Sequence, residues 1–109
     1  MGMRSRRKGK TGELELAGYL TKQGFKSRRG RQYSGDPTTP DVISTLPFHI
    51  ECKRTEALSI YKALEQAQSD AGDQPVVVFH RRNHKTWVVI LSAEEFLTLI
   101  PKNSKGDVP

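Results

Sequence analysis

The feature that most constrains the fold is a short apolar run in the second half of the chain. Residues 75–81, PVVVFHR, are almost continuously apolar, whereas a strand with one solvated face alternates apolar and polar residues. The run therefore predicts a strand that is covered on both faces. Because 109 residues allow one modest core, the cover must come from helices of the same domain.

The other segments supply these helices and further strands. Thr11 is a plausible N-cap for the first helix, Gly24 ends it, and Ser92 with Glu95 forms a capping box for the last helix. Helices are expected at 11–23, 59–72 and 93–100, and strands at 25–33, 41–45, 48–54, 75–81 and 86–91. This order, αβββαββα, predicts an α/β fold with a central mixed sheet flanked by helices.

The sequence also predicts the domain boundaries and the cellular location of the protein. We expect a basic N-terminal arm at 1–10, a single domain at 11–100 and a disordered tail at 101–109. No apolar stretch approaches the roughly 18 residues of a membrane span. Cys52 is the only cysteine, which excludes an internal disulfide and a multi-cysteine zinc cluster. We therefore expect a cytoplasmic protein that does not associate with a membrane and has no disulfide-linked partner.

Positive charge is concentrated in the first third of the chain. Residues 1–33 contain ten Lys or Arg against two Glu, whereas the rest contains eight Lys or Arg against ten Asp or Glu. Such blocks attract phosphate backbones without sequence preference, although a solvated tail is the alternative for residues 1–8. The candidate DNA-binding residues are Arg4, Arg6, Arg7, Lys8, Lys10, Arg28, Arg29 and Arg31.

Three charged residues on the expected hairpin at 41–54 are the candidate site. Asp41 begins one strand, and Glu51 and Lys53 share a face of the next. Either the hairpin faces water, or a cation relieves the repulsion between its carboxylates. Hard oxygen ligands favour Mg²⁺, with Mn²⁺ as a substitute, and the backbone carbonyl of Cys52 is a further candidate ligand.

One more acidic residue, Glu13, extends this candidate site, and His49 and Lys53 share a strand face with Glu51. Glu13 lies on the apolar stripe of the first helix and would complete the acidic set, whereas Glu15 is expected to be exposed. His49 either contacts phosphate or lies exposed at an edge. Lys53 would orient water or neutralise a phosphate, which together with a metal ion describes phosphodiester hydrolysis.

The motifs PDV…IECK and KG…GELEL…L…QGF resemble those of the PD-(D/E)XK nuclease superfamily, and in particular the Holliday junction resolvases of archaea and their phage relatives. The resemblance implies a restriction-endonuclease-like core, Mg²⁺ dependence, and a homodimer that nicks two opposed strands of branched, four-way DNA. Its catalytic residues match Glu13, Asp41, Glu51 and Lys53, and its loop serine matches Ser34, with Thr38 and Thr39 as alternatives.

Two other functions are alternatives for this sequence. A repair or nicking nuclease acting on flaps, ends or duplex DNA would use the same residues on another substrate. A non-catalytic DNA-binding protein would use the fold as a basic platform, but it has no need for carboxylates that face phosphates.

Overall fold

A computed structural model describes residues 3–30, 38–102 and 106–108. Within these ranges the chain forms three helices and five strands in the expected order αβββαββα. The elements are α1 (Met3–Lys22), β1 (Ser27–Arg29), β2 (Val42–Ser44), β3 (His49–Lys53), α2 (Ile60–Ala71), β4 (Val76–His80), β5 (Val88–Ile90) and α3 (Ala93–Thr98).

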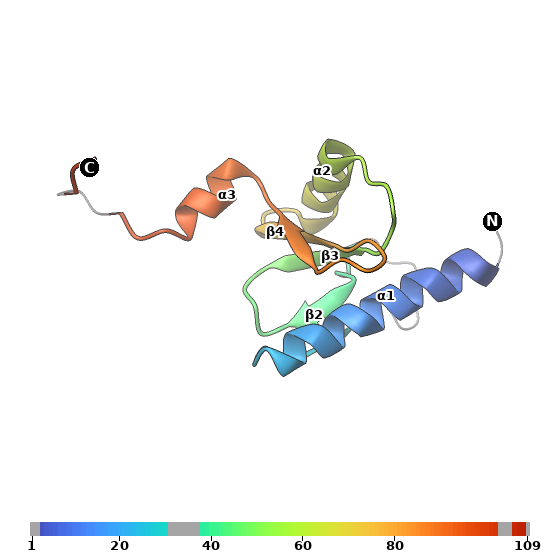
Figure 1. Ribbon diagram of the computed structural model, residues 1–109. Helices are drawn as coiled ribbons and strands as arrows, with labels where there is room; N and C mark the ends of the chain where they lie inside the picture. Colours follow the sequence, from blue (N-terminus) through green and yellow to red (C-terminus); the bar gives the residue numbers. More distant parts are fainter. Residues whose placement is uncertain (1–2, 31–37, 103–105, 109) are drawn as a thin grey trace.

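The five strands form one mixed sheet in the order β1-β2-β3-β4-β5. β3 and β4 are parallel and are joined by α2, whereas all other neighbours are antiparallel. A parallel pair needs such a crossover connection, because the chain must return to the same end of the sheet. Figure 1 shows α1 and α2 on opposite sides of the central strands.

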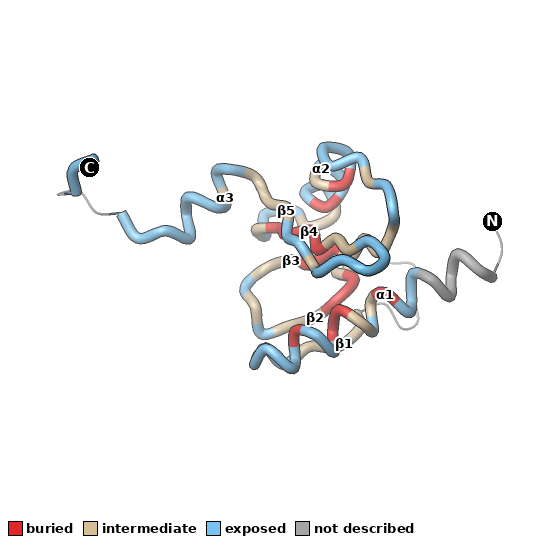
Figure 2. The backbone as a smooth tube through the Cα atoms, in the orientation of Figure 1, coloured by how far each residue is buried: buried red, intermediate tan, exposed pale blue. Residues whose placement is uncertain are grey.

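The core has two parts, one on each face of the sheet. The residues of β4 alternate between the two faces, so this strand contributes to both parts, whereas β3 contributes to one. One part packs α1 against the sheet through Leu16, Ala17, Leu20, Val42, Ile50, Val77 and Phe79. The other packs α2 through Ala63, Ala67, Val76 and Val78. The buried residues of Figure 2 follow this division, which confirms that the apolar run at 75–81 is covered on both faces.

The first helix begins earlier than the sequence analysis predicts. α1 starts at Met3 rather than at Thr11, so most of the basic arm is helical. Lys and Arg have high helix propensity, and no proline interrupts this segment, so the helix extends through it. The helix ends as expected, before Gly24, whose φ of 100° suits the residue after a helix. Neither α1 nor any other helix in the described ranges is long and apolar enough to cross a membrane.

The expected first strand is shorter than predicted. Pairing with β2 covers Ser27–Arg29 rather than residues 25–33, and residues 31–37 lie outside the described part of the chain. The expected tail at 101–109 is only partly described, and its predicted disorder stays a prediction.

Substitution of Gly12 tests the close approach of α1 to the sheet. A Cβ atom at residue 12 would lie 2.6 Å from the Cβ atom of Arg54, which follows β3. We expect Gly12→Ala to lower the free energy of unfolding by about 1–3 kcal/mol, since backbone or side chains must shift. Urea denaturation measures this change.

Gly18 provides the matched control in the same helix. A Cβ atom at residue 18 would meet no heavy atom within 4 Å. Gly18→Ala should therefore stabilise the protein by up to about 1 kcal/mol through helix propensity. Equal effects of the two substitutions would contradict the close contact.

Candidate active site

Two buried carboxylates lie on neighbouring strands. The exposed fractions of Asp41 and Glu51 are 7% and 5%. Asp41 precedes Val42, which pairs with Ile50, and the Asp41 N–H donates to the Ile50 carbonyl at 3.0 Å. The N–H of Cys52 donates to Asp41 Oδ2 at 2.8 Å, which turns this carboxylate toward β3. Burial of two carboxylates is costly unless hydrogen bonds or cations compensate it, so this pair is the centre of the candidate site.

Glu51 is held by a histidine on the same strand. His49 is 1% exposed, and its Nε2 atom lies 2.9 Å from Glu51 Oε1. Because an ionised carboxylate only accepts hydrogen bonds, Nε2 carries the proton in this contact. Because His49 is buried, the alternative of an exposed edge residue is wrong, and its contact with phosphate stays a prediction. The alternation along β3 puts it on the face of Glu51, and that face is covered by the layer that contains α2.

Lys53 follows Glu51 on the same face at the end of β3. It is half-buried, and its carbonyl accepts a hydrogen bond from the N–H of Arg81 at 3.2 Å. By the alternation of β3, its side chain leaves the strand on the face of Glu51. The structure thus groups the three charged residues of the predicted hairpin on β3 and at the start of β2.

Glu13 approaches from the other layer. Its side chain on α1 is half-buried, and Arg29 Nε donates to Glu13 Oε1 at 2.6 Å. Glu13 faces inward, as its place on the apolar stripe suggests. Arg29, a candidate DNA-binding residue, is instead engaged in this ion pair, whereas Lys10 and Arg28 are exposed.

Several predicted site residues, or their side chains, lie outside the described part of the chain. Arg31 and Ser34 lie outside the described residues, as do the side chains of Arg4, Arg6, Arg7 and Lys8, although these four belong to α1. Of the alternative hydroxyl residues, Thr38 is exposed and Thr39 is half-buried. The roles of all these residues stay predictions.

The oxygen atoms of the site suit a hard cation. Among the side chains that the structure describes, no group of three or more His, Cys, Asp or Glu could hold a metal ion. Glu13 therefore does not join Asp41 and Glu51 in one such group, because it extends from the α1 layer. Two carboxylates and the Cys52 carbonyl remain, and Mg²⁺ is commonly held by one or two carboxylates together with water and substrate phosphates. The donor chemistry fits this ion.

The thiol of Cys52 is mostly buried, and three carboxylates lie near enough to act on it. Burial raises the pKa of this thiol far above its ordinary value, and the charges of Asp41, Glu13 and Glu15 raise it further. Lys53 acts in the opposite direction but does not outweigh them. Carboxylates from α1 and from the hairpin therefore both disfavour the ionised form of this thiol.

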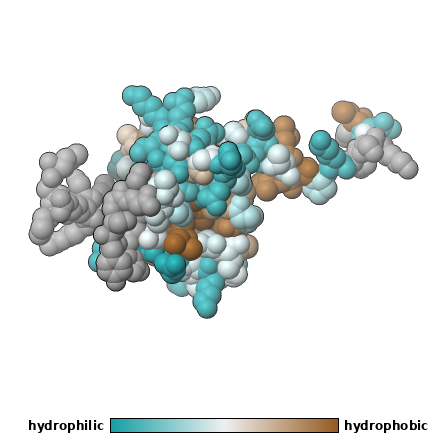
Figure 3. Space-filling model, turned by 180° about the vertical axis from the view of Figure 1, so that it is seen from behind, coloured by the Kyte–Doolittle hydropathy of each residue, from teal (hydrophilic) through white to brown (hydrophobic). Residues whose placement is uncertain are grey.

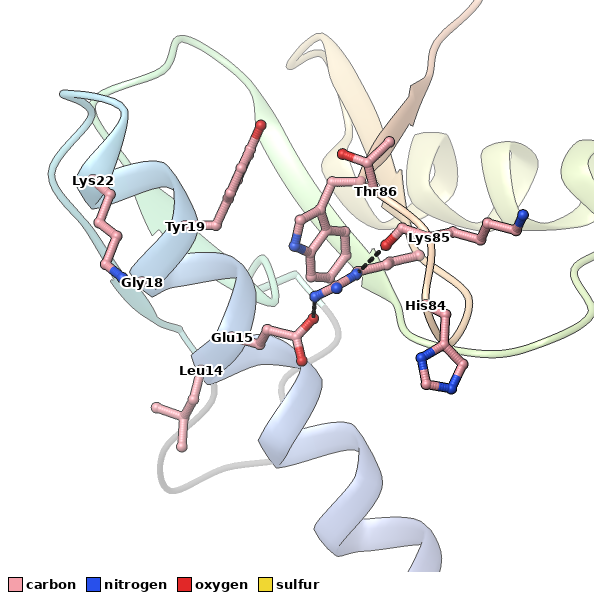
Figure 4. Close-up of a pocket in the computed structure, with 10 residues that line it drawn as sticks. Leu14, Glu15, Gly18, Tyr19, Lys22, His84, Lys85 and Thr86 are labelled. Atoms are coloured by element: carbon pink, nitrogen blue, oxygen red, sulfur yellow. Dashed lines mark hydrogen bonds and ion pairs between the residues drawn. The ribbon is translucent and has the colours of Figure 1, made fainter.

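Glu15 has a structural role that the sequence analysis missed. Its Oε1 atom accepts hydrogen bonds from Arg54 Nε at 3.2 Å and from Arg81 Nη1 at 2.5 Å. Figure 4 shows Glu15 pointing from α1 toward the connection between β4 and β5, where it lines a cavity of about 630 Å³ with Tyr19 and Trp87. The partners are 39 and 66 residues away in sequence, so no local pattern could indicate them.

Comparison with known proteins supports the fold. No family profile and no curated protein sequence matches this chain. Its structure is similar to that of the Holliday junction resolvase Hjc from Archaeoglobus fulgidus, with a TM-score of 0.53 and 20% sequence identity over 87% of this chain and 82% of the other. The chain shares the fold of this protein. The restriction-endonuclease-like architecture implied by the sequence motifs is thereby confirmed.

Alkylation of Cys52 tests the electrostatics of the candidate site. The raised pKa keeps the thiol neutral at pH 8, and the thiolate is the reactive form. We expect the native protein to react with iodoacetamide at least about ten-fold more slowly than the urea-unfolded chain. Mass spectrometry of timed samples measures both rates, and equal rates would contradict a buried thiol among carboxylates.

Proposed function

We propose that this protein is a metal-dependent DNA endonuclease that resolves Holliday junctions by paired nicks. The observation that carries the proposal is the pair of buried carboxylates, Asp41 and Glu51, on adjacent strands of a resolvase-like sheet with Lys53 beside them. A protein that only binds DNA gains nothing from acidic groups at a phosphate site. Hydrolysis of a phosphodiester uses such groups to hold a cation.

Some residues of the site would hold a metal ion, and others orient those residues. Asp41, Glu51 and the Cys52 carbonyl would hold Mg²⁺ or Mn²⁺, with Glu13 extending the negative field from α1. When bound, the ion would supply Lewis-acid stabilisation and activate water at neutral pH. The hydrogen bonds from His49 and from the Cys52 N–H orient the two carboxylates.

The remaining residues act on the substrate. Lys53 would neutralise charge that develops on the phosphate. Ser34 is proposed to contact the phosphate from the preceding loop.

The basic first third of the chain would grip the branched DNA. Its N-terminal residues lie on the same helix as Glu13. Phosphate contacts at the start of this helix would therefore position the DNA relative to the site. Two nicks in opposed strands require two sites, so we propose that the active form is a homodimer. A cytoplasmic setting in a prokaryotic or phage-infected cell is part of the same proposal.

Replacement of Glu51 tests the site. Glu51→Gln keeps the shape of the side chain and removes its charge, so we expect cleavage of a four-way junction with Mg²⁺ to slow by at least about 10³-fold. Binding to the junction should persist, because the basic residues are unchanged. Single-turnover cleavage and gel-shift binding measure the two effects.

Glu65 on α2 provides a control, since it is an exposed glutamate away from β3. Glu65→Gln should cleave normally, and full activity of Glu51→Gln would remove the proposed site. Cleavage of a linear duplex of the same sequence, compared with cleavage of the junction, distinguishes a junction resolvase from a nuclease with another substrate. Equal cleavage of the duplex and the junction would assign the site to a general or repair nuclease.

Deletion of residues 1–8 tests the basic segment. The deletion removes four cationic side chains, so the slope of log binding constant against log salt should become shallower by up to about four. Binding of a junction at several salt concentrations, by fluorescence anisotropy, measures the slope. An unchanged slope would show that these side chains do not contact DNA.

A further inference from the structure

The cavity of about 630 Å³ that Glu15 lines has no part in the proposed hydrolysis. One of its walls is the outer surface of α1, and the other is the connection between β4 and β5. Figure 4 shows Tyr19 on the first wall and Thr86 on the second. Arg81, which also lines the cavity, donates its backbone N–H to the Lys53 carbonyl at 3.2 Å. The cavity therefore adjoins the end of β3 that carries the candidate site.

Two aromatic side chains line this cavity. Tyr19 is 38% exposed, and Trp87 is half-buried. Trp87 packs against Phe79 of the core, with the ring centroids 6.5 Å apart and the ring planes at 75°, so the indole is held in place while part of it stays accessible. Accessible aromatic rings are the platforms on which proteins stack nucleobases. The cavity thus offers two such rings to a flat aromatic ligand.

The lining is also cationic. Lys22, Arg81 and Lys85 bring three positive charges against the one carboxylate of Glu15. Glu15 accepts hydrogen bonds from Arg81 and from Arg54, so its charge is compensated within the protein. Lys22 and Lys85 are exposed, and neither forms an ion pair with another residue of the described ranges. Their ammonium groups can therefore bind an anion from solution.

The combination of aromatic and cationic groups points to a nucleotide, which joins a flat base to a phosphate. Apolar surface elsewhere lacks this combination. Figure 3 shows apolar atoms gathered over α3, but residues 86–101 contain no Lys or Arg. The cavity volume lies within the roughly 300–1,000 Å³ of small-ligand sites. It therefore suits one nucleotide and is too small for a duplex.

The walls of the cavity are tied together in the absence of a ligand. Arg81 joins them, because its Nη1 atom donates to Glu15 on α1 and its Nε atom donates to the Lys85 carbonyl. The Lys85 N–H donates to the Arg82 carbonyl at 3.2 Å, and His84 between them has a φ of 62°, which makes a tight turn of this segment. A preformed cavity loses little conformational freedom when it binds a ligand.

The two rings favour an unpaired nucleotide over a paired one. In a duplex the neighbouring bases cover both faces of each base, so a paired base must first leave the stack. A base in a single strand offers its face at little cost, and the strand supplies a phosphate on each side of it.

We propose that this cavity binds one unpaired nucleotide of a DNA strand, with the base against Tyr19 and Trp87 and the flanking phosphates at Lys22 and Lys85. The inference rests on the proposed function only in taking DNA as the source of the nucleotide. Its test needs neither metal nor cleavage, so its failure is distinguishable from failure of the nuclease site.

The fluorescence of Trp87 tests the site directly, because the chain has a single tryptophan. Titration of the full chain with single-stranded oligothymidylate in EDTA should quench this emission to a plateau, since a base stacks on the indole. A blunt duplex should need at least about ten-fold more phosphate for the same quenching. DNA bound only by the basic first third of the chain would leave the emission unchanged.

Two substitutions separate stacking from charge. Tyr19→Ala should weaken binding of oligothymidylate about ten-fold and leave the slope of log binding constant against log salt unchanged, because it removes a ring and no charge. Lys22→Gln/Lys85→Gln should make this slope shallower by about 1.4, since each lysine contacts one phosphate of a single strand. Tyr61 on α2, which is 79% exposed, is the matched control, and Tyr61→Ala should bind like the wild type.

Gly18 allows the cavity to be filled without loss of a ring or a charge. It lines the cavity, and a Cβ atom there would meet no heavy atom within 4 Å. Gly18→Gln should therefore keep the circular dichroism spectrum of the wild type and abolish the quenching of Trp87. The inference would be overturned by absence of quenching in the wild type, by equal quenching with the duplex, or by wild-type binding in Tyr19→Ala or in folded Gly18→Gln.

Discussion

The parallel pairing of β3 with β4 is the constraint on which the rest of the structure depends. It fixes β3 between two helical layers, so that its five residues must serve two purposes at once. Ile50 and Cys52 face α1 and complete the core, whereas His49, Glu51 and Lys53 face the other way. A register shift of one residue would exchange these sets and bury the core residues on the side of the site. The core and the candidate site therefore depend on the same hydrogen bonds.

The position of α1 is fixed by ion pairs as well as by apolar packing. Glu13 binds Arg29 of β1, and Glu15 binds Arg54 and Arg81, which follow β3 and β4. Three strands are thus tied to one helix, close to the point where the carboxylates of the site act on Cys52. Such pairs add little stability where they are exposed. Here they help to fix the position of α1, which lies close to the sheet because residue 12 has no Cβ atom.

The sequence predicted what depends on local pattern. The element order and the doubly covered strand follow from hydrophobic periodicity, and the grouping of Asp41 with Glu51 follows from a hairpin that connects them directly. It could not predict the arginine partners of Glu15, which are distant in sequence. The burial of His49 was also missed, because it depends on how the α2 layer covers the sheet. The start of α1 was misplaced because Thr11 has the residue type of an N-cap but lies inside the helix.

The hydrogen bond from Cys52 to Asp41 has a consequence for how this site can vary. The donor is the main-chain N–H of residue 52, an atom that every amino acid except proline possesses. The side chain at this position only has to fill the space beneath α1, near Gly12. The residue between the glutamate and the lysine is thus free to change in chemistry while its backbone continues to orient the aspartate. Selection on this position would act on size, and the cysteine itself is replaceable.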